Sequence, residues 1–540
     1  MNPEPRTLLR MVLDGAAAPS AEPILTFVEV RADGSLSEST RTYGELLENG
    51  RRLATALLDL GMKEGDAFAI IMRNYPEFVE AMLASEVVGS VFVPIDPRTR
   101  GDKLSYMLRF AGCRGAIVSG EVIDNLAQLR EELPELTWVL TVDTAARADW
   151  HQPLAGAVRQ CEAAADPMPR PLSAPMQMLY TSGTTGDPKA ILAPNARFAM
   201  TGSLGETIGL QPGDRLYTGL SLTHANAQLI TLGNGLAHQL PVVISRTFTK
   251  SRLWEIVSRY RCTTMNLLGG MATAIFAEPP GLFDLAHDVR FVLSAGMPIS
   301  MWRPFEERFG VKVFEFFGAA EGGLTLNPPG AGPVASIGKA PPSLACEILD
   351  EDDHILGPGQ LGEICFRNAD GSVTPITYFK NPQASEAKTQ GGWFRTGDIG
   401  WKDADGWLYF SHRSGQSIRR NGDFINPRDI ETMIAGMPGV VDVYVYGVAT
   451  SANTPGEKEI VAAVVVGPDW SGPAAVFEHC ARQLGSTSVP SFVQILNEIP
   501  KTASEKPQDR FLIDLLIQDE AMVFNKNGPS RVQPQERITQ

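Results

Sequence analysis

The sequence predicts an α/β protein with a large N-terminal domain of layered subdomains and a small α+β C-terminal domain. Short apolar segments alternate with amphipathic helical segments over the first ~330 residues, which is typical of layered α/β folds. Turn-rich short segments follow, and a smaller unit begins near residue 416. A chain of 540 residues is long enough for two or more such domains.

The alternation is clear near the N-terminus. Leucines at helical spacing predict a helix over residues 43–60, which Gly61 ends. An apolar strand over 67–72, a helix over 76–88 and a strand over 91–95 follow, so the sheet is predicted to be largely parallel. The same pattern returns after residue 175, with buried strands predicted at 217–221, 242–244, 264–267, 291–294 and 313–316.

The last third of the chain has a different character. Segments at 345–349, 362–367 and 407–411, separated by turns, predict an antiparallel β subdomain. Beyond it, helices are predicted at 427–434 and 473–484, and strands at 440–446 and 459–466. We therefore expect an N-terminal domain of residues 1–414, a C-terminal domain of residues 415–520, and a polar, disordered tail of residues 521–540.

Composition limits the partners and the location. The net charge of −15 argues against binding a nucleic-acid backbone, which needs a concentrated basic surface. Six scattered cysteines suggest a reducing compartment. Arg10 and Asp14 interrupt the apolar start, so we expect no signal peptide, and no apolar run approaches the ~20 residues of a membrane span. The prediction is a cytoplasmic protein.

The strongest motif follows an apolar stretch and reads Tyr180-Thr181-Ser182-Gly183-Thr184-Thr185-Gly186-Asp187-Pro188-Lys189. Small hydroxylic residues and glycines can wrap a polyphosphate with backbone N–H groups and hydroxyls, while a lysine supplies positive charge. The order of residues is not that of a Walker loop. Six consecutive Ser, Thr or Gly residues with a Pro-Lys ending favour a phosphate loop over an ordinary flexible turn.

This loop resembles the phosphate loop of the adenylate-forming (AMP-binding) superfamily, which contains acyl-CoA synthetases, adenylation domains of peptide synthetases and luciferases. Further motifs of the superfamily follow in the same order along nearly the whole chain. The resemblance implies that the loop binds the ATP phosphates through Thr181, Ser182, Gly183, Thr184, Thr185 and Gly186, with Lys189 as a cation. It also implies that the small C-terminal domain is a mobile lid.

A second motif, Phe316-Phe317-Gly318-Ala319-Ala320-Glu321, is similar to the Tyr-Gly-x-Thr-Glu segment of the superfamily. By this resemblance Glu321 binds the Mg²⁺ that bridges the ATP phosphates, Phe317 stacks on adenine, and Gly318 belongs to the nucleotide site. Phe317 lacks the usual hydroxyl. Ala320 lacks the threonine hydroxyl that contacts the α-phosphate, so that contact is not expected here.

Two further motifs concern the ribose and the hinge. Arg395-Thr396-Gly397-Asp398 matches the superfamily motif closely, and Asp398 is expected to accept hydrogen bonds from both ribose hydroxyls. Arg413 is expected to contact ribose or phosphate. The hinge position falls on Gly415, where the superfamily usually has Asp or Lys, and Gly422 is expected to flank the thiol tunnel.

The remaining candidates lie near the reacting atoms. Pro500-Lys501-Thr502-Ala503-Ser504-Glu505-Lys506 resembles the superfamily segment whose final lysine, here Lys506, is catalytic during adenylation. His224 matches a histidine near the substrate carboxylate, with Thr223 replacing the usual aromatic residue. The segment Ser294-Ala295-Gly296-Met297-Pro298 resembles the strand end that borders adenine and the acyl pocket, which implies that Gly296 belongs to the nucleotide site.

The resemblance implies an ATP-dependent carboxylic acid–CoA ligase that uses Mg²⁺, forms an acyl-adenylate and transfers the acyl group to coenzyme A. The C-terminal segment is similar to that of carnitine/crotonobetaine-like and bile-acid-like CoA ligases. A stand-alone adenylation enzyme that loads a carrier protein stays open, as does a non-catalytic nucleotide-binding homologue. Related enzymes are often dimers, so a homodimer also stays open. Small or neutral pocket candidates favour a bulky, weakly polar acid; these are Ala225, Asn226, Gln228, Leu268, Gly269, Gly270 and Met297.

Overall fold

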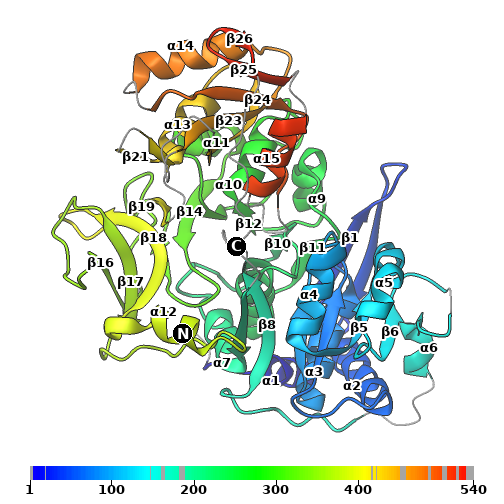
Figure 1. Ribbon diagram of the computed structural model, residues 1–540. Helices are drawn as coiled ribbons and strands as arrows, with labels where there is room; N and C mark the ends of the chain where they lie inside the picture. The colour runs from blue at the N-terminus through cyan, green and yellow to red at the C-terminus, as the bar shows by residue number, and fades with distance from the viewer. Residues whose placement is uncertain are drawn as a thin grey trace.

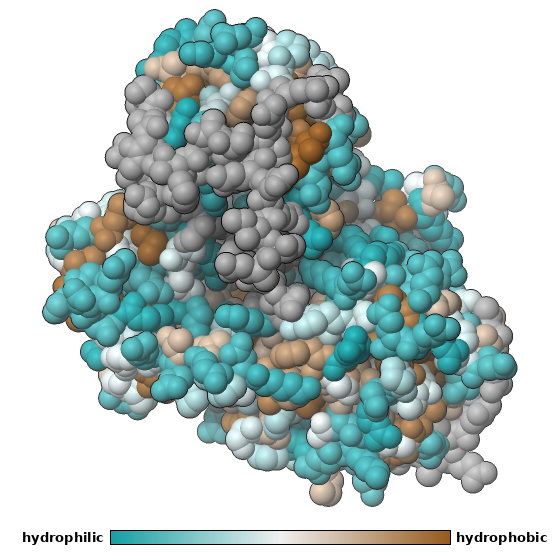
Figure 2. All heavy atoms as spheres, in the orientation of Figure 1, coloured by the Kyte–Doolittle hydropathy of each residue, from teal (hydrophilic) through white to brown (hydrophobic). Residues whose placement is uncertain are grey.

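The computed structural model describes residues 4–18, 20–145, 148–159, 165–181, 189–414, 418–420, 423–449, 458–484, 488–501, 507–518 and 522–530. Figure 1 shows a large body with a small antiparallel sheet at one side and the C-terminal elements above it. The face drawn in Figure 2 is mostly hydrophilic with scattered hydrophobic residues, which suits a chain of net charge −15.

One large sheet has eight strands in the order β15-β14-β13-β12-β10-β11-β1-β2. The neighbours from β14 to β1 run parallel, and β15 and β2 add antiparallel edges. The strands are β1 (Leu25–Val30), β2 (Leu36–Arg41), β10 (Leu216–Thr218), β11 (Val242–Ser245), β12 (Thr264–Leu268), β13 (Phe291–Ala295), β14 (Lys312–Phe317) and β15 (Thr325–Asn327).

The second large sheet has seven strands in the order β7-β6-β5-β3-β4-β8-β9. All neighbours are parallel except the β8–β9 pair, whose strands are joined by residues 182–188. The strands are β3 (Ala67–Ile71), β4 (Val91–Pro94), β5 (Cys113–Val118), β6 (Trp138–Thr141), β7 (Gln152–Pro153), β8 (Pro175–Thr181) and β9 (Lys189–Pro194).

Helices cover both sheets. The helix α3 (Pro76–Val88) has nearly every side chain buried, because it belongs to a core cluster with residues of both sheets. A capping box formed by Thr42 and Glu45 begins α2 (Tyr43–Asp59), which packs against α3. The other helices of this part are α1 (Leu8–Ala16), α4 (Gly101–Ala111), α5 (Ile123–Leu129), α6 (Leu154–Arg159), α7 (Asn195–Gly202), α8 (Gly233–His238), α9 (Leu253–Arg259), α10 (Gly269–Phe276) and α11 (Ile299–Phe309), with a π-helix at Asn226–Leu232 and short 3₁₀ turns at Gly120–Val122, Arg130–Glu132 and Lys250–Arg252.

Two smaller sheets complete the fold. The antiparallel β subdomain contains β16 (Leu344–Leu349), β17 (Gly362–Asn368), β18 (Phe394–Lys402) and β19 (Leu408–Arg413), with α12 (Pro382–Lys388) and a 3₁₀ turn at Gln390–Gly392 beside it. The C-terminal sheet orders β22 (Val440–Val448), β23 (Glu459–Val466), β24 (Phe492–Leu496), β25 (Val523–Asn525) and β26 (Gly528–Pro529). Its helices are α13 (Pro427–Ala435), α14 (Pro473–Gln483) and α15 (Asp509–Gln518), and β20 (Ile418–Arg420) pairs with β21 (Asp423–Ile425).

The α/β class and the expected strands and helices are confirmed, with ends shifted by a few residues. The prediction of a disordered tail from residue 521 is wrong for the stretch 522–530, which supplies β25 and β26 to the C-terminal sheet. The physical reason is Val523, which is buried against Leu512 and Leu516 of α15. The proposed boundary at residue 415 falls outside the described residues. Among the described helices, none is both long and apolar enough to cross a membrane.

The ends of β12 and β13 approach each other very closely. A Cβ atom added to Gly269 would lie 2.1 Å from the carbonyl oxygen of Gly296, which is fixed backbone and cannot move aside like a side chain. Gly296 itself has a φ of +91°, a conformation that favours glycine. At Gly270 the added Cβ would instead lie 3.3 Å from the flexible Lys501 ammonium.

We therefore predict that Gly269→Ala lowers both stability and activity, because it pushes the two strand ends apart. Gly270→Ala is the matched control and should leave the free energy of unfolding nearly unchanged. Urea unfolding of both variants measures the difference, with a loss of about 2 kcal/mol or more expected for Gly269→Ala from overpacking. Equal stability of the two variants would contradict the close approach.

Candidate active site

The predicted site residues of the large sheet follow the carboxyl ends of neighbouring parallel strands. Gly296 comes directly after β13, and Phe317 ends β14, with Gly318 next to it. In such sheets ligands bind at the carboxyl edge of the strands. The C-terminal elements lie above this edge (Figure 1), so the predicted nucleotide site lies where the two parts of the protein meet.

Glu321 is held by a tyrosine that the sequence analysis did not identify. The Tyr378 hydroxyl donates a hydrogen bond to Glu321 Oε1 at 2.8 Å. The ammonium of Lys189 lies 5.7 Å from the centre of the Tyr378 ring. Burial and the charge of Glu321 raise the pKa of Tyr378, so the phenol stays protonated and remains a donor. Tyr378 therefore lies close to two predicted site residues, Lys189 at the start of β9 and Glu321 in the segment after β14.

A single carboxylate at this place suits Mg²⁺ bound together with a polyphosphate. Among the residues that the structure describes, no three His, Cys, Asp or Glu side chains form a metal-binding group. Mg²⁺ commonly takes only one or two protein carboxylates and completes its shell with water and substrate phosphates. Glu321 fits that role, with one of its oxygens oriented by Tyr378.

A partly buried arginine binds the backbone of the same segment. Arg197, on α7, donates from Nη2 to the carbonyl oxygen of Ala319 at 2.7 Å. Burial lowers the pKa of Arg197, and the negative charge of Glu321 opposes that shift. Arg197 thus fixes the backbone two residues before Glu321 and adds positive charge near it. No motif in the sequence marked this arginine.

Asp398, which is predicted to bind the ribose, and Arg413, which is predicted to contact ribose or phosphate, are neighbours in the structure, and both ligand contacts remain predictions. Asp398 and Arg413 lie directly opposite each other on β18 and β19. Arg413 Nε lies 3.4 Å from Asp398 Oδ1, and the Asp398 side chain is only 10% exposed. Glu363 accepts hydrogen bonds from Gly397 N and Arg395 Nη1, both at 2.7 Å, and so fixes the turn before Asp398.

The ring of Phe317 packs against two phenylalanines of the β subdomain. It stacks on Phe366 with ring centres 6.3 Å apart and lies 6.4 Å from the ring of Phe410. Phe317 is half-buried in this arrangement. Stacking on adenine therefore stays a prediction for the part of the ring that these neighbours leave uncovered.

His224 lies at the start of an unusual polar segment. Its Nδ1 accepts a hydrogen bond from the backbone N–H of Asn226 at 3.2 Å, so a neutral His224 ring carries its proton on Nε2. The π-helix Asn226–Leu232 begins here, and such helices often occur at functional sites. Asn266 Nδ2 donates to Asn226 Oδ1 at 2.6 Å, and Gln228 Nε2 donates to Leu222 O at 2.6 Å. The pocket candidates Asn226 and Gln228 are thus fixed by buried hydrogen bonds.

Several predicted site residues lie outside the described part of the chain: residues 182–186, Gly415, Gly422 and Lys506. The side chain of Thr181 is likewise not described, although its backbone pairs with Lys189. Lys501, five residues before Lys506, lies beside the pocket candidate Gly270, so the C-terminal domain contacts the start of α10. Lys501 Nζ donates to Asp442 Oδ2 at 2.5 Å.

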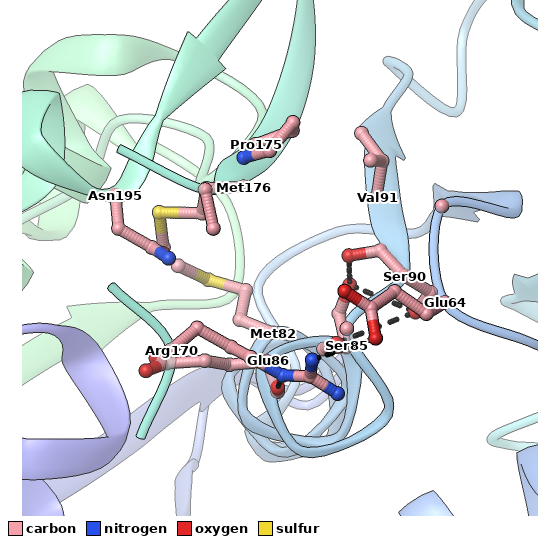
Figure 3. Close-up of a pocket in the computed structure, with 13 residues that line it drawn as sticks. Glu64, Met82, Ser85, Glu86, Ser90, Val91, Arg170, Pro175, Met176 and Asn195 are labelled. Carbon is pink, nitrogen blue, oxygen red and sulfur yellow. Dashed lines mark hydrogen bonds and ion pairs between the residues drawn. The ribbon is translucent and has the colours of Figure 1, made fainter. Parts of the chain in front are cut away.

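A separate hollow lies among α3, β4 and β8 (Figure 3). Arg170 spans it, with Nη1 2.9 Å from Glu64 Oε2 and Nη2 donating to Val88 O at 3.0 Å. None of the predicted site residues lines this hollow. The hollow is therefore separate from the nucleotide site that is predicted at the strand ends.

Comparisons with known proteins identify relatives of the chain as a whole. The family model for AMP-binding enzymes matches residues 17–375, and that for the AMP-binding enzyme C-terminal domain matches residues 429–506. The sulfoacetate–CoA ligase of Cupriavidus necator is 31% identical over 477 residues, which cover 86% of this chain and 91% of that protein. A crotonobetaine/carnitine–CoA ligase of Escherichia coli is 27% identical over 476 residues, with the same coverage of 86% and 91%.

Solved structures share the fold. An anthranilate CoA ligase in complex with anthranoyl-AMP superposes with a TM-score of 0.82 at 21% identity, covering 95% of this chain and 97% of that one. A benzoate CoA ligase from Burkholderia xenovorans gives a TM-score of 0.80 at 20% identity, covering 94% and 99%. The chain belongs to the AMP-binding enzyme family. Its resemblance to the acyl-CoA synthetase branch of the adenylate-forming enzymes is confirmed, and with it the class of acid–thiol ligase.

A buried carboxylate holds the strand end that borders the site. Glu315, on β14, accepts hydrogen bonds from Gly296 N at 2.5 Å and from Met297 N at 3.2 Å. Burial raises the pKa of Glu315 to about 7 from an ordinary value of 4.5. The folded protein therefore binds this proton more tightly than the unfolded chain does between those two pH values.

This shift gives a prediction about stability and pH. Between pH 4.5 and about 7 the native state binds more protons than the unfolded state. The contribution of Glu315 to the free energy of unfolding therefore falls as the pH rises. We expect the free energy of unfolding of the wild type to fall relative to that of Glu315→Gln between pH 4.5 and about 7. Urea unfolding at several pH values measures the difference, and a difference that does not change with pH would contradict the assignment.

Proposed function

We propose that this protein is an ATP-dependent carboxylic acid–CoA ligase that forms an acyl-adenylate and releases pyrophosphate and AMP. The observation that carries the proposal is the arrangement at the strand ends. Glu321, Tyr378 and Lys189 lie close together near the start of β9. Asp398 on β18 pairs with Arg413 on β19. In this proposal Glu321 would be the metal ligand, Lys189 a cation and Asp398 the ribose-binding carboxylate of one site.

In the first step a carboxylate oxygen of the acid attacks the α-phosphorus of ATP, and the bond to pyrophosphate breaks. The transition state gathers negative charge, so catalysis depends on positioning and on fixed positive charge. Mg²⁺, when held by Glu321, would neutralise charge on the phosphates. Lys189 and Lys506 are proposed to add cations, Asp398 to hold the ribose, and His224 to donate from Nε2 to the substrate carboxylate.

In the second step the sulfur of CoA attacks the acyl carbonyl carbon, the bond to the adenylate oxygen breaks, AMP leaves, and the thiol proton is released. We propose that residues 415–520 rotate about Gly415 between the steps. Lys506 would then leave the site, and Gly422 would flank the thiol tunnel. Glycine at the hinge suits this role, because glycine adopts a wide range of φ and ψ.

For the carboxylic acid substrate we propose a chemical class and not a particular compound. The pocket candidates contribute no carboxylate for an α-ammonium group, and Asn226 and Gln228 present neutral amides. A bulky, weakly polar acid remains the proposed substrate, although relatives bear the names of sulfoacetate and crotonobetaine/carnitine ligases. Action in the cytoplasm and assembly as a homodimer are also parts of this proposal.

The first test measures pyrophosphate release from Mg-ATP across a panel of carboxylic acids, with and without CoA. We expect release that depends on the acid, increases with CoA and yields a thioester. Release that CoA does not change would favour a carrier-protein acceptor. No release with any acid, despite ATP binding, would favour a non-catalytic homologue. Acetate or free amino acids as the best substrates would contradict the proposed acid class.

A second test separates the two half-reactions. Lys506→Ala should lower the rate of adenylation by at least about 100-fold, because a cation facing the transition state is lost. Thioester formation from a pre-made acyl-adenylate should continue at close to the wild-type rate. Lys526→Ala, which changes an exposed lysine, is the control and should affect neither step. Equal loss in both half-reactions would show that the role given to Lys506 is wrong.

A further inference from the structure

We propose that Lys388 is a positioning residue that fixes Asp398 and thereby sets how strongly the enzyme distinguishes ATP from 2′-deoxy-ATP. The proposal deepens the proposed function, since it concerns the ribose subsite of the same ATP site. Lys388 belongs to none of the motifs that identify the family. It lies at the end of α12, seven residues before Arg395.

The turn that carries Asp398 is a bulge in β18. Arg395 pairs with Cys365 and Ile399 pairs with Glu363, so four residues of advance along β18 oppose two along β17. The two extra residues interrupt the ladder and re-aim the side chains of this segment. Gly397, with a φ of +80°, makes the required backbone conformation possible.

The polar backbone groups of a bulge lose ladder partners and need others. Lys388 Nζ donates to Arg395 O at 2.8 Å and to Thr396 O at 3.0 Å. Glu363 accepts from Gly397 N at 2.7 Å, and the Thr396 hydroxyl oxygen accepts from Asp398 N at 3.0 Å. One ammonium group therefore satisfies two successive carbonyls directly before the residue that is expected to bind ribose.

The helix that carries Lys388 is also tied to the metal side of the site. At its N-terminal end, Asn381 caps α12, and Ser385 Oγ accepts a hydrogen bond from Tyr378 N at 2.9 Å. Tyr378 in turn donates to Glu321. α12 thus connects the Tyr378–Glu321 pair at one end with the Asp398 turn at the other.

The charge of Lys388 suits this place. Burial lowers the pKa of Lys388, while the negative charges of Glu321, Glu363 and Asp398 raise it and the positive charge of Arg413 lowers it further. The ammonium group also lies 5.8 Å from the Phe394 ring centre, a favourable position for a cation. An apolar side chain here would leave the two carbonyls without their donor.

The consequence concerns the ribose more than the phosphates. If Lys388 is lost, the bulge relaxes and Asp398 no longer meets the ribose hydroxyls at the right place. Binding of ATP should then weaken, whereas 2′-deoxy-ATP, which already lacks one of these hydrogen bonds, should be affected less. A hydrogen bond to a charged group contributes about 1.5–3 kcal/mol, which corresponds to about tenfold or more in affinity.

The experiment measures the dissociation constants of ATP and 2′-deoxy-ATP by titration calorimetry with the full-length protein. Lys388→Met should lower the preference for ATP about tenfold, toward the value of Asp398→Asn. Lys388→Arg, which can still donate to both carbonyls, should retain most of the preference. Lys380→Met is the matched control: Lys380 lies on the same segment and donates to a carbonyl, Phe110 O at 3.0 Å, but it does not contact the Asp398 turn.

The proposal is overturned if Lys388→Met binds both nucleotides with an unchanged ratio, whatever happens to their separate affinities. If Lys388→Met does not fold, Lys388→Arg decides: a ratio that falls as far as in Asp398→Asn overturns the proposal, and a retained ratio supports it. Because binding needs no acid and no turnover, a wild type that prefers ATP but makes no adenylate would contradict the proposed function alone. A wild type that makes thioester, with a ratio insensitive to Lys388, would contradict this inference alone.

Discussion

Two kinds of contact hold together the carboxyl edge of the large parallel sheet: a close backbone approach that leaves no room for a side chain, and hydrogen bonds to one buried carboxylate. Gly269 at the end of β12 lies against the carbonyl of Gly296 at the end of β13. Glu315, on the next strand, binds the N–H groups of Gly296 and Met297. Three neighbouring strand ends are therefore fixed relative to one another. These contacts position the segments that follow the strands, which carry the predicted pocket and nucleotide-binding residues.

Three residues outside the known motifs donate hydrogen bonds to the predicted site residues or to the backbone beside them. Arg197 binds the backbone before Glu321, Tyr378 binds its carboxylate, and Lys388 binds the backbone before Asp398. The sequence lacks the superfamily hydroxyls at Phe317 and Ala320. Arg197 and Lys388, whose pKa values are lowered by burial and raised by the charge of Glu321, place positive charge near the proposed triphosphate site. Positive charge that is fixed in advance in this way does not have to reorganise as the transition state forms.

Much of the fold could be predicted from the sequence, because its signals are local. Helix α3 and strands β12 to β14 appear almost where hydrophobic periodicity placed them, and the motifs indicated Glu321, Asp398 and Arg413 directly. The prediction of a disordered tail is wrong for Val523, because the burial of this side chain depends on its packing against α15. Tyr378, Arg197 and Lys388 were missed for a similar reason. Each is an ordinary residue in its local segment and gains its role only when distant segments meet.

The central claim is that a carboxylate oxygen of the acid becomes bonded to the α-phosphorus of ATP. The most direct measurement is a turnover experiment with a carboxylic acid labelled with ¹⁸O, followed by mass spectrometry of the nucleotide and phosphate products. The account predicts that AMP carries one ¹⁸O atom from the acid, because thiolysis of the adenylate leaves that oxygen on the phosphorus. Label in inorganic phosphate with ADP as the product, or thioester formation with unlabelled AMP, would contradict it.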